Sequence, residues 1–423
     1  MAEAAAFSAA MGTTGVPARA APPSPPSPPA VEVAQEEAAP VAQPSPPPLP
    51  QAAPPPAPPP SPPPLRPRRP STSSCRSVEE FERLGRVAEG TYGVVYRARD
   101  TATGQVVALK KIKLGGGGSA HPTTGEVGFP LTALREVTTL LACDHPAIVG
   151  VSEVVVGGGG KGGGEAVYLV MEWADHDLAG LASAAPRRFS IPEIKTIMLQ
   201  LASGLAYLHA RWLLHRDIKP ANILYAGTGG RVMLADFGLA RPYGSPLRPY
   251  TRPVVTLYYR APELLLGAPT YATPIDVWSL GCVMGELLLG RGAPLFEARA
   301  GRGGPAAGEL AQLAAITGVL GPIDEGSWPG CSTLPGLASM QYTRPGVGLR
   351  SLFPAPGPGG TDASTRLSAA GMDLLAQMLR YAPEDRISAA EITSHPWFAE
   401  FPVPTPGELM PTYPSTQAGR GGR

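Results

Sequence analysis

Three oxygen-bearing side chains stand at short, defined spacing in the middle of this chain: Asp217, Asn222 and Asp236. The first two belong to the run His215–Asn222, with the letters HRDIKPAN, and the third opens Asp236–Gly238, with the letters DFG. Asp217 is suited to accept a proton from a substrate hydroxyl, and the other two offer the hard oxygens that Mg²⁺ prefers. Two such patterns in this order strongly indicate a phosphoryl-transfer site, which requires positioning and charge neutralisation.

Length and composition narrow the possible classes of protein. A chain of 423 residues suggests two or three domains, and its formal net charge of +1 gives no support for a nucleic-acid or membrane-surface partner. No apolar run approaches the length that spans a bilayer, and the first residues lack the apolar core of a secretory signal. The four cysteines are far apart, which fits a reducing compartment and argues against a disulfide framework or a zinc site.

Residues 1–76 are dominated by Pro, Ala and Ser and hold nearly half of the 53 prolines. Such a segment cannot bury enough apolar surface to offset its conformational entropy, so we expect a disordered arm with polyproline II character. Its Pro-x-x-Pro spacings would suit SH3 or WW domains, and a passive tail is the alternative interpretation. The arginines Arg66, Arg68 and Arg69 are a poor match to a nuclear address because Pro67 interrupts them.

From about Phe81 the composition becomes globular. The runs 94–96 and 106–109 are predicted to be strands on either side of a turn at Thr103–Gly104. Apolar residues then recur at helical spacing, at Leu131, Leu134, Val137 and Leu141. Glycine runs at 115–118 and 157–164 and a stretch at 297–308 lack the flanking pattern of phosphate-binding loops. We expect these three stretches to be flexible surface loops.

Capping boxes mark two helix starts, at Ser190–Glu193 and Ser388–Glu391. The first opens a helix whose apolar face would comprise Ile194, Ile197, Met198, Leu201, Leu205 and Leu208. Because strands come early and helices late, we expect an α+β fold, with a small β-rich lobe joined to a larger helical lobe. The expected folded domain covers 77–398 and is followed by a tail over 399–423. Its N-lobe would cover about 77–173 and its C-lobe about 174–398.

A glycine-rich segment precedes the first lysine of interest and fits a loop that covers the phosphates of ATP, except that Ala88 replaces its first glycine. Glycine lets the backbone approach phosphates closely. Since Gly90 and Gly93 keep the tip compact, we expect the cover over ATP to survive; an ordinary hairpin is the alternative for this segment taken alone. The loop residues are Val87, Ala88, Glu89, Gly90, Thr91, Tyr92, Gly93, Val94 and Val95.

Lys110 ends the run Val107–Lys110, which is predicted to be the strand that offers a lysine to the α- and β-phosphates. A predicted helix that carries Glu136 follows, and an ion pair between Lys110 and Glu136 would direct the ammonium group at ATP. Lys219, two residues after Asp217, is positioned to steady the γ-phosphate. A lysine there is typical of enzymes that phosphorylate Ser or Thr.

Two further acidic residues are expected to have structural roles. The triplet Ala261–Glu263 closes the segment that begins at the DFG triplet, at a spacing right for an activation loop. Glu263 is expected to pair with Arg386. Asp276, near the start of a predicted buried helix, is expected to hold the backbone near His215 rather than to take part in chemistry.

On these motifs the chain resembles the eukaryotic protein kinases and, within them, the cyclin-dependent kinases, over about 75–413. Pro130–Glu136 is similar to the helix that these kinases present to a cyclin. Val254–Glu263 is similar to their activation segment, with Tyr258 where the family usually has Trp. The chain most resembles the subgroup of ten-type and eleven-type kinases, including plant and algal G-type members, at Ser77–Phe81, Tyr243–Leu247 and Glu408–Pro414.

The resemblance implies the bilobal protein-kinase fold, ATP and Mg²⁺ as cofactors, and a cyclin of the L-type or a related type as partner. It implies protein substrates with Ser/Thr-Pro, because Val254–Val255 is similar to the platform that favours proline, which lacks a backbone N–H, directly after the target residue. Roles in cell-cycle, transcription or splicing control follow from it, as does residence in the nucleus and also in the cytoplasm. The departure at Ala88 is mild, since eleven-type members also lack that glycine.

The family's nucleotide-binding roles carry over by motif position. Met171 matches the gatekeeper, and Asp177 would reach the ribose. Glu172 and Ala174 would offer backbone groups to adenine. The apolar sandwich around the purine would consist of Val87, Val95, Ala108 and Leu224.

The family's regulatory sites also have counterparts. Thr251 matches the activating phosphothreonine, and charge-assisted arginine bonds to its phosphate would order the loop. The arginines expected to converge on it come from three segments: Arg135, Arg216 and Arg241. Thr91 and Tyr92 match inhibitory sites, where added negative charge would oppose the phosphates of ATP.

Two alternatives stay open. In an inert pseudokinase scaffold the Pro-rich arm would recruit partners, but only Ala88 and the glycine insertions favour it, and the phosphoryl-transfer set is intact. A mitogen-activated kinase would carry a Thr-x-Tyr pair in its activation segment. Here Tyr250 precedes Thr251, and Arg252–Pro253 follows, which disfavours that family.

Overall fold

The computed structural model describes residues 75–90, 93–112, 137–157, 166–184, 188–227, 229–243, 257–298, 305–339, 345–353 and 367–414. The Pro-rich arm up to residue 74, the glycine run at 115–118 and residues 158–164 of the run predicted at 157–164 lie outside these ranges, while Gly157 ends a strand. So do five predicted site residues: Thr91, Tyr92, Arg135, Glu136 and Thr251. No helix within the described ranges is both long enough and apolar enough to cross a membrane.

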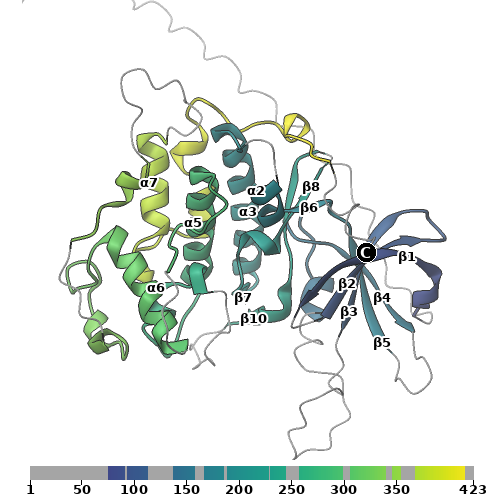
Figure 1. The fold of residues 1–423 in the computed structure, drawn as a ribbon, viewed down its shortest axis with the longest axis horizontal. Helices are drawn as coiled ribbons and strands as arrows, with labels where there is room; N and C mark the ends of the chain where they lie inside the picture. The colour runs from purple at the N-terminus through teal and green to yellow at the C-terminus, as the bar shows by residue number, and fades with distance from the viewer. Residues whose placement is uncertain are drawn as a thin grey trace, which may run out of the picture. The chain divides into compact units, whose positions relative to one another are not determined.

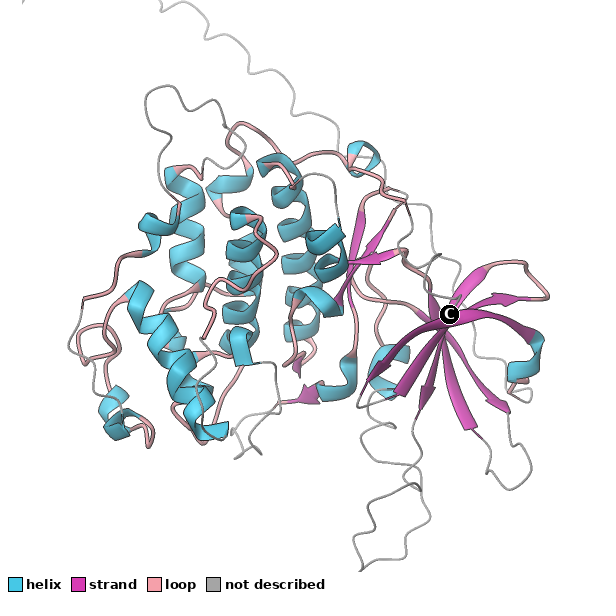
Figure 2. Ribbon diagram, viewed as in Figure 1, coloured by secondary structure: helices cyan, strands magenta, loops and turns pink. Residues whose placement is uncertain are grey.

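The first sheet, whose strands are drawn in magenta in Figure 2, is antiparallel. Its five strands have the order β1-β2-β3-β5-β4. Their bounds are Phe81–Gly90 for β1, Gly93–Asp100 for β2, Val106–Ile112 for β3, Val151–Gly157 for β4 and Ala166–Glu172 for β5. The predicted turn between β2 and β3 is present, with Gly104 at a φ of +73°, a conformation that glycine adopts readily.

The two faces of β3 have different surroundings, because successive side chains of a strand point to opposite faces. Val107 and Leu109 belong to a small apolar cluster with Phe81 and Tyr168, which covers one face of the sheet. Ala108 belongs to the main core. Lys110 shares the face of Ala108 and is buried, so the strand presents its ammonium group toward the helical part of the chain.

The helical part is built around α3 (Ile191–Ala210) and α5 (Pro274–Leu289), which lie side by side with α7 (Ala369–Met378) next to α5 (Figure 1). Glu193 accepts a hydrogen bond from the Ser190 backbone N–H at 2.7 Å, so the predicted capping box opens α3. All six residues predicted for its apolar face are buried. Further described helices are α2 (Leu178–Ala184), α4 (Pro262–Leu265), α6 (Pro305–Leu320) and α8 (Ala389–Thr393).

Two small sheets are formed by short strands between the end of β5 and the start of α4. One has the order β6-β8-β9 and the other pairs β7 with β10. Their bounds are His176–Asp177 for β6, Leu213–Leu214 for β7, Ile223–Ala226 for β8, Arg231–Leu234 for β9 and Arg241–Pro242 for β10. A 3₁₀ turn over Pro220–Asn222 leads into β8, and another over Phe237–Leu239 follows β9 by two residues.

The sheet-rich first part and helical second part confirm the predicted α+β fold. Val137 and Leu141, which recur at helical spacing in the sequence, lie on a helix described over 137–141, and Leu141 at its end is 53% exposed. One local prediction is wrong in part. The stretch predicted as a loop over 297–308 is helical from Pro305. Proline is well tolerated in the first turn of a helix, where its missing N–H removes no intrahelical bond.

Candidate active site

One buried carboxylate holds the backbone of the loop that carries Asp217. Asp276, on α5, is 1% exposed and accepts hydrogen bonds from the backbone N–H groups of His215 at 2.9 Å and Arg216 at 2.8 Å. Nε2 of His209 lies 3.0 Å from the same carboxylate. Burial opposes ionisation of Asp276, but these hydrogen bonds hold its pKa below the ordinary value. The structural role predicted for Asp276 is confirmed.

His215 links this loop to the DFG segment. Its ring is fully buried and packs against Phe237 with 4.9 Å between the ring centres. Nε2 lies 3.1 Å from the carbonyl oxygen of Ala235, and Nδ1 lies 3.3 Å from the backbone N of Asp217. Burial lowers the pKa of His215, so the ring is neutral. A neutral ring satisfies both contacts only with its proton on Nε2, because the carbonyl accepts and the backbone N–H donates.

The two carboxylate oxygens of Asp217 have different surroundings: one accepts hydrogen bonds within the loop, and the other accepts none from the described residues. Oδ2 accepts hydrogen bonds from Nζ of Lys219 at 2.7 Å and Nδ2 of Asn222 at 2.8 Å. The same Nδ2 also donates to the Asp217 carbonyl oxygen at 2.8 Å. Oδ1 is buried and has no hydrogen-bond partner in the described part of the chain. A buried acceptor without a partner is unfavourable, so this atom marks a place where a ligand can donate.

An ion pair joins the first sheet to the DFG segment. Nζ of Lys110 lies 2.9 Å from Oδ1 of Asp236, and the Lys110 side chain is 8% exposed. Burial opposes ionisation of Asp236, but the positive charge of Lys110 outweighs it and lowers the pKa of that carboxyl. Asp236 has φ +61° and ψ +72°, a left-handed conformation that is uncommon for a residue with a side chain and that clusters at functional sites. The predicted partner Glu136 lies outside the described residues, so that pair stays a prediction.

The glycine-rich segment is a hairpin between β1 and β2. Its register pairs Ala88 with Val95 and Glu89 with Val94. Ala88 is exposed, so its methyl group meets no crowded site in the protein. Gly93 has a different constraint, because a Cβ atom built there would overlap the carbonyl oxygen of Lys111 on β3. The close approach of two strands therefore requires glycine at position 93.

The predicted adenine-binding residues lie at the end of β5 and just after it. Met171 is buried and pairs with Ala108 on β3. The backbone N–H of Glu172 donates to the Gly150 carbonyl at 2.9 Å, so adenine recognition at Glu172 would use its carbonyl oxygen. Ala174, two residues further along, is also buried.

The β6-β8 pair brings together the residues predicted to meet the ribose and the purine. Asp177 stands opposite Leu224 in this register. Oδ1 of Asp177 accepts a hydrogen bond from the backbone N–H of Gly180 at 2.7 Å, which fixes its carboxylate at the start of α2. Val87 and Val95 come from the hairpin of the first sheet, so the predicted nucleotide-binding set draws on both parts of the chain.

Two of the three predicted phosphate-binding arginines are described. Arg216 donates to the Leu239 carbonyl oxygen at 2.6 Å and to the hydroxyl of Tyr271 at 2.9 Å. Arg241, on β10, pairs with Leu214 on β7, two residues before Arg216. Arg135 and Thr251 lie outside the described residues, so convergence on a phosphothreonine stays a prediction.

The predicted pair of Glu263 and Arg386 is confirmed. Both side chains are almost fully buried and make two parallel contacts, at 2.8 and 3.1 Å. Arg386 also donates to the carbonyl oxygens of Pro274, Arg380 and Tyr381, which satisfies its remaining N–H groups. This geometry gives a buried ion pair the additional hydrogen bonds that it requires.

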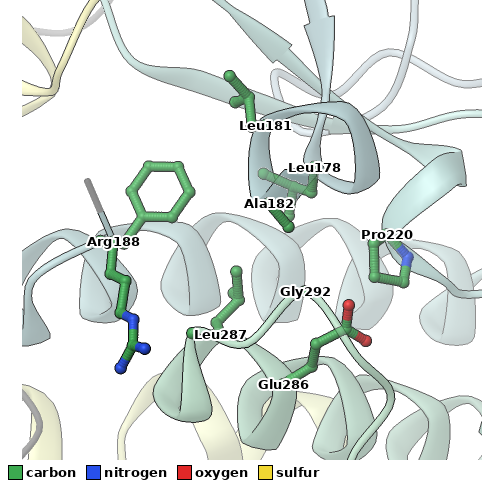
Figure 3. A pocket seen from close by; sticks show the side chains of 10 residues that line it. Leu178, Leu181, Ala182, Arg188, Pro220, Glu286, Leu287 and Gly292 are labelled. Atoms are coloured by element: carbon green, nitrogen blue, oxygen red, sulfur yellow. The ribbon is translucent and has the colours of Figure 1, made fainter. Parts of the chain in front are cut away.

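A further buried carboxylate, which the sequence patterns did not indicate, borders a pocket of about 260 Å³ (Figure 3). Glu286 on α5 accepts a hydrogen bond from the hydroxyl of Tyr259 at 2.7 Å, and burial raises its pKa. The pocket is lined by residues of α2, of the end of α5 and of the segments next to them, with Pro220 from the 3₁₀ turn before β8. None of the residues predicted to contact ATP lines it, so it is separate from the predicted nucleotide site.

Comparison with known proteins agrees with this geometry. The Protein kinase domain family matches residues 81–398. Cyclin-dependent kinase G-2 of Oryza sativa subsp. japonica is 48% identical over 341 residues, which is 81% of this chain and 44% of that protein. Cyclin-dependent kinase G1 of Arabidopsis thaliana is 47% identical over 339 residues, covering 80% of this chain and 52% of that protein.

An animal relative extends the match over most of its own length. Cyclin-dependent kinase 11B of Rattus norvegicus is 43% identical over 347 residues, which is 82% of this chain and 72% of that protein. By contrast, the chain spans about half the length of the plant relatives. Because the family match covers most of the chain and these relatives are more than 40% identical to it, the chain belongs to the protein kinase family and, within it, to the cyclin-dependent kinases.

Proposed function

We propose that this chain is a cyclin-dependent, proline-directed protein kinase that transfers the γ-phosphate of ATP to Ser or Thr. The observation that carries the proposal is the carboxylate of Asp217. One of its oxygens is bonded by Lys219 and Asn222, and the other is buried without a partner in the described structure. A substrate hydroxyl is a donor of the kind that this oxygen lacks.

Each residue of the site has a task in this reaction. Asp217 Oδ1 accepts the hydrogen bond of the substrate hydroxyl and then its proton. Lys219, held at 2.7 Å from Oδ2, brings a positive charge beside the transferred group. Lys110 lies on the strand next to the glycine hairpin and would bind the α- and β-phosphates. His215 stays neutral and fixes the loop without taking part in proton transfer.

The nucleotide would lie between the glycine hairpin and the β6-β8 pair. We propose that residues 87–95, with Ala108 and Leu224, enclose the purine and cover the phosphates. Glu172 and Ala174 would provide backbone groups for adenine behind the gatekeeper Met171, and Asp177 would bind the ribose.

The donor set fits a magnesium ion. Asp236 uses one oxygen for Lys110, and Asn222 uses its amide nitrogen for Asp217. Within the described residues, the other carboxylate oxygen of Asp236 and the amide oxygen of Asn222 can therefore serve as hard ligands. We propose Asp236 and Asn222 as the protein ligands. When bound, the ion would neutralise charge on the phosphates.

The finer assignments rest on the family. We propose that 130–136 faces a cyclin of the L-type or a related type, and that phosphorylation of Thr251 activates the kinase through Arg135, Arg216 and Arg241. Phosphorylation of Thr91 or Tyr92 would inhibit it. We further propose a nuclear role in cell-cycle, transcription or splicing control, with the Pro-rich arm as a ligand for SH3 or WW domains.

Radiolabelled phosphate transfer tests the proposal. The full chain purified with an L-type cyclin should phosphorylate a Ser-Pro peptide, and a Ser-Ala peptide much less. Asp217→Asn should reduce turnover by about a hundred- to ten-thousandfold, the usual contribution of a positioned general base. Near wild-type turnover in this variant would contradict the mechanism. Equal activity of the chain without any cyclin would contradict the dependence on that partner.

A further inference from the structure

Residues 400–413, here named the C-terminal strap, run back along the protein in yellow from α3 to the β6-β8 pair (Figure 1). The strap begins on two side chains of α3. Nζ of the buried Lys195 donates to the carbonyl oxygens of Glu400 at 2.9 Å and Pro402 at 2.8 Å. Oγ1 of Thr196 donates to the Thr405 carbonyl oxygen at 2.6 Å. These bonds hold the backbone of the strap.

The middle of the strap packs on the turn between β8 and β9. A Cβ atom on Gly407 would lie 2.7 Å from the Gly229 carbonyl oxygen, so the two backbones are in direct contact. Met410 is 4% exposed, and its side chain would overlap any Cβ built at Gly230. The strap therefore lies closely against this turn. The turn connects β8, which begins directly after Asn222, with β9, which ends two residues before Asp236.

The end of the strap is fixed to β6 and β8 themselves. The hydroxyl of Tyr225, on β8, donates to the Pro411 carbonyl oxygen at 2.5 Å. Nε2 of His176, on β6, lies 3.2 Å from the Tyr413 carbonyl oxygen. The Tyr413 ring packs 6.1 Å from His176 and from Phe189, and 6.2 Å from Tyr225. Tyr413 thus occupies a cluster of rings behind the two strands.

The register of β6 and β8 relates these contacts to the nucleotide. His176 pairs with Tyr225, and the next pair along is Asp177 with Leu224. Neighbouring side chains of a strand point to opposite faces, so the strap covers the face that is opposite to Asp177 and Leu224. Burial agrees, since Tyr225 is fully buried while Leu224 is only partly so.

We propose that Tyr413 is a positioning residue for the nucleotide. It fixes His176 and Tyr225 from behind, and thereby sets the position of Asp177 and Leu224 against ribose and purine. The proposal rests on the function proposed above. It concerns only affinity for the nucleotide, because the bonds of Asp217 and Asp276 involve no residue of the strap.

Calorimetric titration of the full chain with MgADP tests this inference. Tyr413→Ala should raise the Kd about five- to tenfold, equivalent to about 1.0–1.4 kcal/mol. Tyr413→Phe keeps the ring and should restore affinity. Thr196→Val is the matched control. It removes the hydrogen bond to the Thr405 carbonyl oxygen, a contact of the strap that lies away from β6 and β8. It should lower the melting temperature without changing the Kd.

The kinase assay supplies a second readout. Tyr413→Ala should raise the KM for ATP by the same factor and leave kcat within about twofold of the wild type. A residue that affects only nucleotide binding changes KM, whereas one that affects the chemical step changes kcat. If Tyr413→Ala does not fold, Tyr225→Phe removes only the hydroxyl that bonds to Pro411 and should raise the Kd about twofold.

Four outcomes are distinct. Weaker MgADP binding in Tyr413→Ala, with normal binding in Thr196→Val, supports the positioning role. Equal Kd values for Tyr413→Ala and the wild type overturn it, as does a rise of the same size in Thr196→Val. A wild-type chain that binds no MgADP overturns the proposed function itself.

Discussion

Lys110 and Asp217, the two charged groups of the candidate site that come from the sheet and from a loop, are held in place in different ways. Lys110 lies on a central strand whose place is set by pairing with β2 and β5, and a single described ion pair connects it to Asp236. Asp217 lies on a loop, and that loop has no ladder of its own. A buried carboxylate at Asp276 and a neutral ring at His215 hold it instead. Strand pairing thus supports one half of the site, and buried polar contacts support the other.

This difference separates chemistry from stability. A strand residue that only points into the site can be replaced without loosening its support, because backbone pairing remains. A loop held by buried charge loses its support when that charge is removed, since the unpaired N–H groups stay buried. Substitutions on the two sides should therefore have different signatures.

The largest expected effect is on activity, from Lys110→Met. Turnover should fall at least about a hundredfold. Removing one preorganised positive group that stabilises the negative charge developing on the phosphates in the transition state has effects of that size. Stability should change little, since Asp236 is 32% exposed at its side chain and can be hydrated when unpaired. Phosphate transfer and thermal melting measure the two quantities. A large loss of melting temperature would show that the strand side also depends on its charge.

Asp276→Asn should reduce the free energy of unfolding by about 3–5 kcal/mol, because it breaks a buried charged network. The amide offers one acceptor in place of two and directs its own N–H group at a backbone donor. Urea unfolding measures the change. Asp373→Asn, at a side chain that is 61% exposed, is the control and should stay within about 0.5 kcal/mol. Equal values for the two variants would contradict the dependence of the loop on the buried carboxylate of Asp276.

Acid should loosen the loop side first. The pKa of His215 is lowered in the fold by burial, while in the unfolded chain it is about 6.5. The unfolded state therefore binds the proton more readily, so stability is full above about pH 6.5 and declines as the pH falls below it. His145, whose pKa burial also lowers, contributes in the same direction.

His215→Phe isolates this contribution. The ring still packs against Phe237, but it no longer titrates. Unfolding in urea at pH 7.5 and 5.5 should show a smaller loss of stability on acidification than in the wild type. An unchanged loss would exclude His215 as the group responsible.

The smallest expected effect is the loss of stability when one helix cap is removed, a polar contact that stabilises only its own helix. Ser388→Ala removes the side chain that accepts from the Glu391 backbone N–H at 3.2 Å at the start of α8. A helix cap of this kind contributes about 1 kcal/mol. Differential scanning calorimetry against Ser332→Ala, an exposed serine, measures it. A loss as large as that of Asp276→Asn would remove the distinction between local caps and the buried network.

Motifs with strict spacing predicted two buried structural contacts of the helical part, at Asp276 and Glu263. The role of Asp276 was predictable because its partners lie in the His215–Asn222 motif. The role of Glu263 was predictable because it closes the activation-segment motif and pairs with Arg386. Capping boxes located the starts of α3 and α8 for the same reason, since both reciprocal bonds involve residues three apart. The sheet-first, helix-later order gave the α+β class.

Other features had no sequence signal. Lys195 and Thr196 bind carbonyl oxygens of the strap, and every residue has such a group, so no residue type marks the contact. The exposure of Leu141 depends on where its helix ends, which periodicity does not locate. The ion pair of Lys110 and Asp236 joins residues 126 positions apart, and the motif predicted another partner for the lysine.

The crowding at Gly93 affects how a mutational scan of the hairpin is interpreted. Substitution there forces a side chain against the Lys111 carbonyl oxygen, so it separates β2 from β3 before any nucleotide is present. Inactive Gly93 variants would therefore report a spread sheet rather than a lost phosphate contact. Ala88, which is exposed, is the position where added bulk tests the ligand alone.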